Sequence, residues 1–277
     1  MTNPLPEIHI QSFEELERYL IQIKEELRER KPTPCVLQSE PLFRGHACSS
    51  WRLQTTLERF IPNEKIFIRE YNTFLARTRP TVETITKRSW RISDSVKLSY
   101  DELFDEPPNL EFMAYARHHG FPSPLLDWSR SPYVALYFAF IKANQNQDTA
   151  LFVFIKSPEG VRSASRQQPQ ICELSQLDAT HARHFSQQSR YTICVQHDED
   201  DDWTYCSHHE LFIQQSCSDQ NDLRKLIIPG SLRLEILDRL DHMNINGYTL
   251  FNSEDGLMEA LSFREIEALE ARRRGEI

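Results

Sequence analysis

Glycine is scarce in this chain, which contains seven glycines among its 277 residues. Neither the GxGxxG pattern of dinucleotide-binding Rossmann domains nor the GxxxxGK[ST] phosphate loop can be built from them. Both nucleotide-binding motifs are therefore excluded. Glycine is favoured where the backbone has a positive φ angle or approaches another segment closely, so we expect the few that remain to mark such positions.

Long apolar runs and paired cysteines are also missing. The longest apolar run, YVALYFAFI at 133–141, is half the length of about 18 residues that spans a bilayer, and Lys142 follows it. The first ten residues lack the basic and apolar stretches of a signal peptide. None of the six cysteines forms a CxxC pair. We therefore expect a cytoplasmic protein with reduced thiols, no membrane span and no metal.

A basic surplus is absent as well. The chain carries 41 acidic and 32 basic residues, giving a formal net charge of −9 and a pI of about 5.6. General nucleic-acid binders show a basic footprint, so we expect no general nucleic-acid binding. Hydrophobic residues make up 39% of the chain, enough to bury a large core. We expect a single domain over 1–277, in which 53–118 forms a helical lobe.

Hydrophobic spacing and capping residues predict helices and strands in an irregular order. The predicted helices are 12–30, 53–79, 110–119, 133–141, 231–244 and 262–274. The pair Ser131–Pro132 suits the N-cap and first position of the helix that continues over 133–141. The predicted strands are 35–44, 124–129, 150–156, one within 183–195, and 224–230. Because the two kinds of element do not alternate regularly, the sequence predicts an α+β fold, a twisted mixed sheet with helices packed around it.

Three apolar segments are interrupted by polar residues. Arg44 follows a strand-like run, and Asp127 stands between Leu126 and Trp128. A buried carboxylate needs a partner, which Arg44 or the helix start near Ser131 could supply. The third segment brings Gln187, Gln188 and Ser189 into a strand. We predict that one polar cleft is lined by Arg44, Asp127, Ser129 and Gln188. The alternative is that Arg44 and Asp127 form a purely structural ion pair.

Other side chains near these segments are predicted to contact a ligand. Trp51 and Trp128 suit either a core or a stacking surface. His118 and His119 end a predicted helix, where their rings favour the local dipole. The full set of predicted ligand-binding residues is Phe43, Gly45, Trp51, His118, His119, Trp128, Gln187 and Asp255.

Four stretches resemble the motifs of the FRG domain family. They are Phe43-Arg44-Gly45 with Trp51 downstream, HHGFPSPLLDWSRSPYVALYFA at 118–139, QQSRYTI at 187–193 and LFNSEDGL at 250–257. Two positions depart from the family pattern, because Ser189 replaces a usual glycine and Asn252 a usual proline. The resemblance covers about residues 10–260, and the family name by itself implies no activity.

A weaker resemblance links the order of these segments to ADP-ribosyltransferases. It implies a related fold and NAD as substrate, with Arg44 on phosphate, Ser129 on the nicotinamide ribose, and Asp127 or Gln188 at the reacting centre. Gln188 stands near the position of a catalytic glutamate, which a neutral amide replaces poorly. The implied function is an ADP-ribosyltransferase-like enzyme, a bacterial toxin or defence effector acting on a nucleotide or protein acceptor. The alternative is a non-catalytic nucleotide- or partner-binding module.

Overall fold

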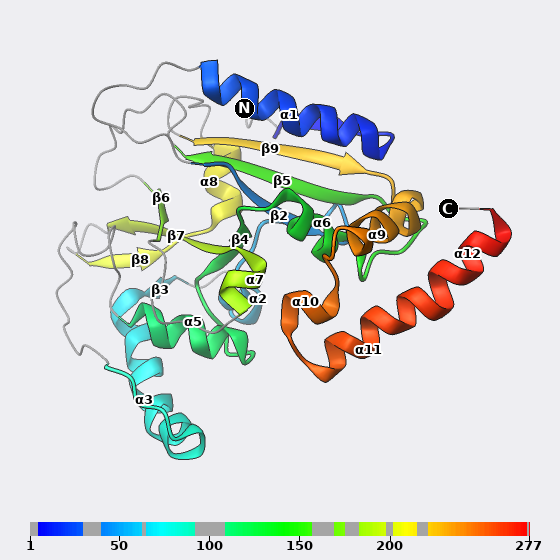
Figure 1. Cartoon of the computed structure of the whole chain (residues 1–277). Helices are drawn as coiled ribbons and strands as arrows, with labels where there is room; N and C mark the ends of the chain where they lie inside the picture. Colours follow the sequence, from blue (N-terminus) through cyan, green and yellow to red (C-terminus); the bar gives the residue numbers. More distant parts are fainter. Residues whose placement is uncertain are drawn as a thin grey trace.

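The computed structural model describes residues 5–29, 40–62, 65–91, 109–156, 169–174, 183–197, 202–214, 221–275 and 277. Helices surround one mixed sheet, which confirms the predicted α+β class (Figure 1). The strands are β1 Glu7–His9, β2 Leu42–His46, β3 Ile66–Phe67, β4 Leu126–Ser129, β5 Thr149–Lys156, β6 Gln170–Glu173, β7 Ser189–His197, β8 Trp203–Tyr205 and β9 Asn221–Ile228.

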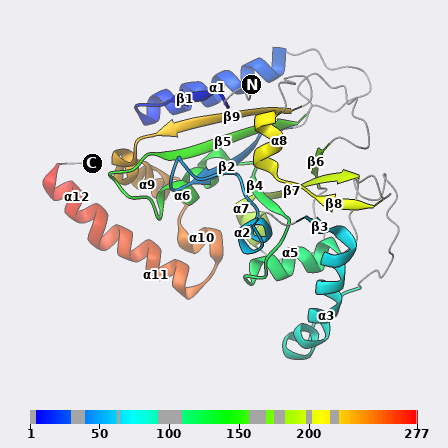
Figure 2. The same cartoon turned by 180° about the vertical axis from the view of Figure 1, so that it is seen from behind.

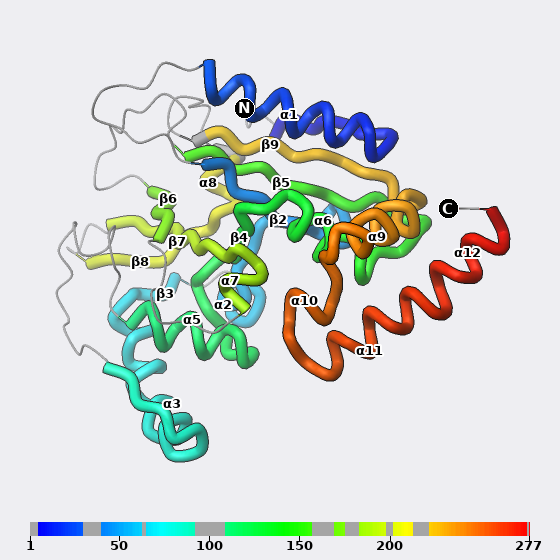
Figure 3. The backbone as a smooth tube through the Cα atoms, in the orientation of Figure 1, coloured from blue at the N-terminus to red at the C-terminus, as the bar shows by residue number. Residues whose placement is uncertain are grey.

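The helices gather at both ends and on both faces of this sheet (Figures 1 and 2). They are α1 Phe13–Glu29, α2 Thr56–Phe60, α3 Ile68–Thr86, α5 Leu110–His118, α6 Pro132–Phe140, α7 Arg183–Gln187, α8 His208–Gln214, α9 Arg233–His242, α10 Gly247–Phe251, α11 Glu254–Ser262 and α12 Leu269–Arg274. A π-helical turn, Phe263–Ala268, joins the last two into the rod that Figure 3 shows. None of the described helices is long and apolar enough to cross a membrane.

The sheet order is β1-β9-β5-β2-β4-β7-β8-β3, and β6 pairs with β7 outside this path. β1 runs parallel to β9, and the other neighbours are antiparallel. β2 and β4 are therefore central strands. Successive side chains of a strand point to opposite faces, so these two strands carry residues into both layers of the core.

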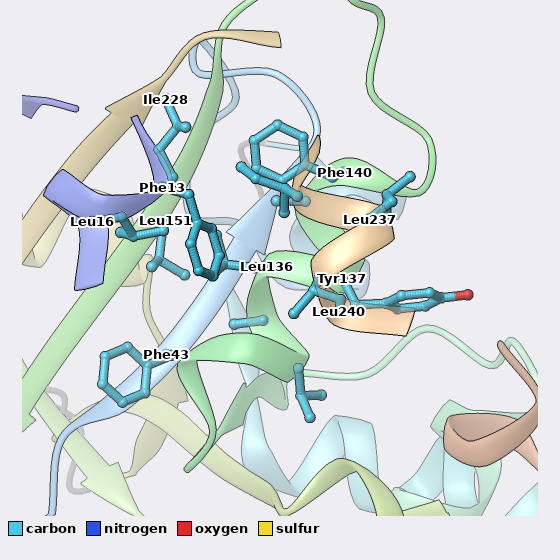
Figure 4. Close-up of a cluster of buried hydrophobic side chains, with 14 of the residues drawn as sticks. Phe13, Leu16, Phe43, Leu136, Tyr137, Phe140, Leu151, Ile228, Leu237 and Leu240 are labelled. Atoms are coloured by element: carbon cyan, nitrogen blue, oxygen red, sulfur yellow. The ribbon is translucent and has the colours of Figure 1, made fainter. Parts of the chain in front are cut away.

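The larger core cluster lies between the sheet and helices α1, α6 and α9 (Figure 4). Leu151 and Val153 of β5 point into it, whereas Phe152 and Phe154 point to the opposite face, where α8 packs through Leu211. Figure 2 shows α8 on that face. A third cluster joins α3 and α5 to the β7–β8 end of the sheet.

Helix α6 begins where the sequence predicts. The side chain of Ser131 accepts a hydrogen bond from the backbone N–H of Val134 at 3.3 Å, and Pro132 occupies the first turn, where its missing N–H costs nothing. Most of its side chains are buried. The helix lies across β2 at Gly45, where an added Cβ would come within 1.9 Å of the carbonyl oxygen of Ala135. Gly45 therefore permits a close contact between strand and helix.

The single helix predicted over 53–79 is wrong. α2 ends at Phe60, and Ile61 leaves the helical region with a φ of −128° and a ψ of 75°, because a following proline disfavours the helical conformation. Pro62 cannot continue the helix, and the chain adds β3 to the edge of the sheet before α3 begins. The helical lobe predicted over 53–118 thus also supplies a strand, and the division into domains stays a prediction. Residues before 40 in the predicted strand 35–44 lie outside the described part of the chain.

Candidate functional site

A cavity of about 440 Å³ opens beside the central strands β2 and β4. Helices α2, α5, α6, α7 and α10 and the start of strand β7 supply the rest of its wall. Its lining combines arginine, histidine and aromatic side chains with one carboxylate, among the residues described. These lining residues are Phe43, Arg44, Gly45, Thr56, Arg117, His118, Asp127, Trp128, Ser129, Ala135, Phe138, Arg183, Gln187, Ser189 and Phe251.

The structure brings most of the predicted site residues to this cavity. Of the four predicted cleft residues, Arg44, Asp127 and Ser129 line it, and Gln188 does not. Of the predicted ligand-binding residues, Phe43, Gly45, His118, Trp128 and Gln187 line it. Four predicted residues lie outside the described lining: Trp51, His119, Gln188 and Asp255.

The predicted residues outside the cavity are all exposed. Trp51 is 57% exposed and lies near His46, with ring centroids 6.2 Å apart. His119 packs on Tyr115. Gln188 adopts a φ of 48° in the turn between α7 and β7. Asp255 lies in the first turn of α11.

Arg44 lies where the β2–β4 ladder opens. Phe43 and Ser129 are the one registered pair between these strands. Just beyond it, Arg44 Nη1 donates a hydrogen bond to the backbone oxygen of Asp127 at 2.7 Å. A side chain thus supplies a bond between the strands that the ladder lacks. This places a guanidinium group between two central strands and against the cavity.

Asp127 has Arg117 as its main partner, which the sequence analysis missed. Arg117 Nε donates to one carboxylate oxygen at 2.5 Å, and its Nη2 donates to the other. Arg44 Nη1 lies 3.7 Å from Asp127 Oδ2, so the predicted pair exists as a weaker contact. Burial raises the pKa of Asp127, but the charge and hydrogen bonds of Arg117, helped by the charge of Arg44, lower it to about 2. Asp127 is therefore ionised at neutral pH.

Arg44 also has a neutral histidine as partner. Its Nε donates to His46 Nε2 at 3.0 Å. Burial lowers the pKa of Arg44 to about 10, although the charge of Asp127 opposes the shift. Burial and the positive charge of Arg44 lower the pKa of His46 to about 3. At neutral pH the guanidinium is therefore charged, and His46 serves as an acceptor.

Two buried histidines make stability depend on pH. His208 is fully buried, and burial together with the charge of Arg44 lowers its pKa to about 3, like that of His46. In the unfolded chain both rings titrate near about 6.5, so the unfolded state binds more protons between the two values. Their contribution to stability is complete above about pH 6.5 and is lost as the pH falls toward about 3.

We expect His208→Gln to reduce this pH dependence. Between about pH 4 and 6, its free energy of unfolding should change less steeply than that of the wild type, by about 1.4 kcal/mol per pH unit. Urea unfolding at a series of pH values measures both slopes. Equal slopes in the two proteins would show that His208 is not held neutral by the fold.

Ser129 and Gln187 join three elements at the cavity wall. Ser129 Oγ donates to the backbone oxygen of Gln187 at 2.7 Å and accepts from the N–H of Ser131 at 3.0 Å. Gln187 Nε2 donates to the backbone oxygen of Leu250 in α10 at 3.1 Å. These bonds fix the end of α7 against β4 and α10. Ser129 therefore helps to hold the cavity wall in place.

One arginine and two aromatic side chains, from α7, α6 and α10, also line the wall. Arg183 Nε donates to the backbone oxygen of Phe251 at 3.3 Å, and its guanidinium lies 5.7 Å from the centre of that ring. Phe138 of α6 packs edge-on against Phe251, with ring centroids 5.9 Å apart. Sequence reasoning missed these three residues. Phe138 and Phe251 both lie within segments that resemble family motifs, which was a usable signal.

Two histidines and a tyrosine meet beside the cavity. His118 Nε2 and His184 Nε2 lie 2.6 Å apart, and Tyr191 Oη lies 2.9 Å from each. The three residues come from the end of α5, from α7 and from β7. Of these, His118 borders the cavity. The sequence analysis singled out His118 alone, because its partners lie more than sixty positions away.

The comparison with known families matches part of this site. Residues 39–148 match the model of the FRG domain. The matched segment contains Arg44, Arg117, His118, Asp127 and Ser129. The rest of the wall, from α7, β7 and α10, lies beyond it. No match was found among curated proteins or among solved structures.

Proposed function

We propose that the cavity binds NAD and that the chain acts on it as an ADP-ribosyltransferase-like enzyme. The observation that carries this proposal is the charge of the lining. Arg44, Arg117 and Arg183 stand against one carboxylate, Asp127, among the described lining residues. Guanidinium groups bind phosphate oxygens through paired hydrogen bonds, so an anionic nucleotide suits this surplus of positive charge.

Arg44 is the residue best placed to hold a phosphate. Its Nε and Nη1 bond to protein atoms, whereas its Nη2 makes no hydrogen bond within the described structure. The half-buried guanidinium of Arg44, whose side chain is 16% exposed, gains from an anionic partner because water screens the interaction less there than in bulk solvent. The contacts to His46 and Asp127 hold the group in place before a ligand arrives.

The size and apolar parts of the cavity also support a nucleotide. Its volume of about 440 Å³ falls within the range of about 300–1,000 Å³ usual for small-molecule sites. Phe43, Phe138 and Phe251 give it apolar faces for a flat ring. The order of the elements, with Arg44 on β2, Ser129 before α6 and the glutamines before β7, resembles that of ADP-ribosyltransferases.

A second candidate is nucleotide binding without transfer. Both oxygens of Asp127 are held by Arg117, and no glutamate is among the described lining residues. The hydroxyl hydrogen of Ser129 is directed to Gln187. A site lacking an available carboxylate has no anionic group to stabilise an oxocarbenium-like transition state. If this second candidate is correct, the protein should bind NAD saturably and should not consume it.

We expect Arg44→Gln to weaken NAD binding about 10- to 100-fold, because it removes a charge-assisted hydrogen bond to phosphate. Calorimetric titration measures binding, and labelled NAD with cell lysate measures transfer and nicotinamide release. The matched control is Arg77→Gln, an exposed arginine of α3 outside the cavity. Wild-type affinity in a folded Arg44→Gln protein would contradict the assignment of Arg44. Binding without turnover in the wild type would favour the second candidate.

A further inference from the structure

This inference rests on the proposed function, in which NAD loses nicotinamide in the cavity. The acceptor hydroxyl must then give up one proton. The bound nicotinamide ring is a cation, and it leaves as a neutral molecule with the electron pair of the broken bond. Its departure therefore needs no acid. The oxygen of a hydroxyl acceptor forms the new bond to the ribose carbon, and its hydrogen must leave. The protein has to supply one base, positioned at the cavity.

Asp127 is a poor base in this setting. Arg117 donates to both of its oxygens, and Arg44 lies 3.7 Å from one of them. Burial raises the pKa of Asp127, but the charges and hydrogen bonds of these arginines outweigh it and hold the pKa at about 2. A carboxylate with so low a proton affinity takes up little proton from a hydroxyl group near neutral pH.

The histidine cluster offers a better proton acceptor. A neutral imidazole has both a donor and an acceptor nitrogen and an intrinsic pKa near neutrality. His118 Nε2 lies 2.6 Å from His184 Nε2, so one of these nitrogens can donate a hydrogen bond to the other. Tyr191 Oη lies 2.9 Å from both nitrogens. A proton taken up by His118 would therefore be stabilised by an N–H bond to His184.

We propose that His118 is the general base that takes the proton of a hydroxyl acceptor as the nicotinamide–ribose bond of NAD breaks. His184 and Tyr191 are positioning residues, which fix the orientation of the His118 ring and share the charge of the imidazolium. The acceptor is water or an alcohol group. The products are neutral nicotinamide, the ADP-ribosylated acceptor and a proton held by the pair of imidazoles.

Charged groups around the cluster set its proton affinity. Arg117 precedes His118 on α5, Arg44 comes from β2 and Arg183 from α7, and all three oppose a further positive charge. Asp127 on β4 favours a positive charge on His118, because the carboxylate and the imidazolium attract each other. His184 adds the hydrogen bond that the protonated ring donates. Removing His184 should therefore make His118 a weaker base.

The test separates binding from turnover. We expect His118→Gln to bind NAD within about threefold of the wild type, yet to release nicotinamide at least about 100-fold more slowly. His184→Gln should lower the maximal rate of nicotinamide release, because His118 becomes a weaker base, and should move the acidic limb of the pH–rate profile to lower pH by about one unit, since the charged form of His118 loses a partner. Tyr191→Phe keeps the ring and removes only the hydroxyl, so we expect its acidic limb to move to lower pH as well, because the imidazolium loses a hydrogen-bonding partner.

His242→Gln is the matched control, because this histidine is exposed on α9, away from the cavity. Its binding, rate and pH profile should equal those of the wild type. Full turnover in His118→Gln with intact binding would overturn the inference, and so would an unmoved acidic limb in both other variants. A wild type that binds NAD without releasing nicotinamide would also overturn it, and would leave nucleotide binding standing. A wild type that does not bind NAD would refute the proposed function itself.

Discussion

Gly45→Ala is expected to destabilise the protein by more than about 3 kcal/mol, the upper end of the usual cost of overpacking. The new Cβ would lie 1.9 Å from the carbonyl oxygen of Ala135 and 2.7 Å from the backbone nitrogen of Ala139. Both atoms belong to the backbone of α6, so no side-chain rotation relieves the clash. Either the whole helix moves away from β2 or the local strand distorts. Thermal and urea unfolding measure the loss.

Gly120→Ala is the matched control for this prediction. Gly120 has a φ of 88°, and no atom lies within 4 Å of an added Cβ. Alanine there should cost about 1 kcal/mol through backbone strain alone. If Gly45→Ala is no less stable than Gly120→Ala, α6 does not pack on β2 as closely as the structure shows. Because Gly45 also borders the cavity, a folded Gly45→Ala protein should bind nucleotide poorly.

Arg117→Met is expected to cost about 3 kcal/mol of stability, because it leaves the Asp127 carboxylate with a single weaker partner. The side chain of Arg117 is 10% exposed, and it donates to both oxygens of Asp127. Arg44 remains, at 3.7 Å from one oxygen. The exposed part of Asp127 borders the cavity, which limits the loss by admitting water. Urea unfolding of the variant gives the value.

A double-mutant cycle isolates the contribution of this ion pair. Asp127→Asn keeps the shape of the side chain and removes its charge, and the cycle combines it with Arg117→Met. We expect a coupling energy of about 2 kcal/mol, so the double variant should be more stable than the sum of the single losses implies. Additivity within about 0.5 kcal/mol would mean that Arg117 and Asp127 do not stabilise one another.

Features that depend on neighbouring residues in the chain could be predicted from the sequence. A charged residue inside an apolar run identified Arg44 and Asp127, because burial of either group demands a partner. The Ser131–Pro132 pair located the start of α6 through its capping bond. The scarcity of glycine predicted that each glycine marks a positive φ angle or a close approach between backbone segments. Gly45 marks such an approach, and the segment that approaches it is helix α6.

Contacts between residues on different elements could not be predicted from the sequence. Arg117 lies ten residues before Asp127 at the end of a different element, and nothing in the chain distinguishes it from other arginines on helices. Gln188 was expected in the cavity, yet the turn at its positive φ leaves Gln187 and Ser189 in the wall. A shift of one residue exchanges which side chain faces a site. The pairing of His118 with His184 likewise depends on how α5 and α7 meet.

The central claim is that a nucleotide occupies the cavity beside Arg44. A crystal structure of the wild type with saturating NAD tests it most directly. We predict NAD in the cavity, with a phosphate oxygen within about 3 Å of Arg44 Nη2 and the nicotinamide ribose near His118. NAD bound elsewhere on the protein, or an empty cavity at saturating NAD, would contradict the account.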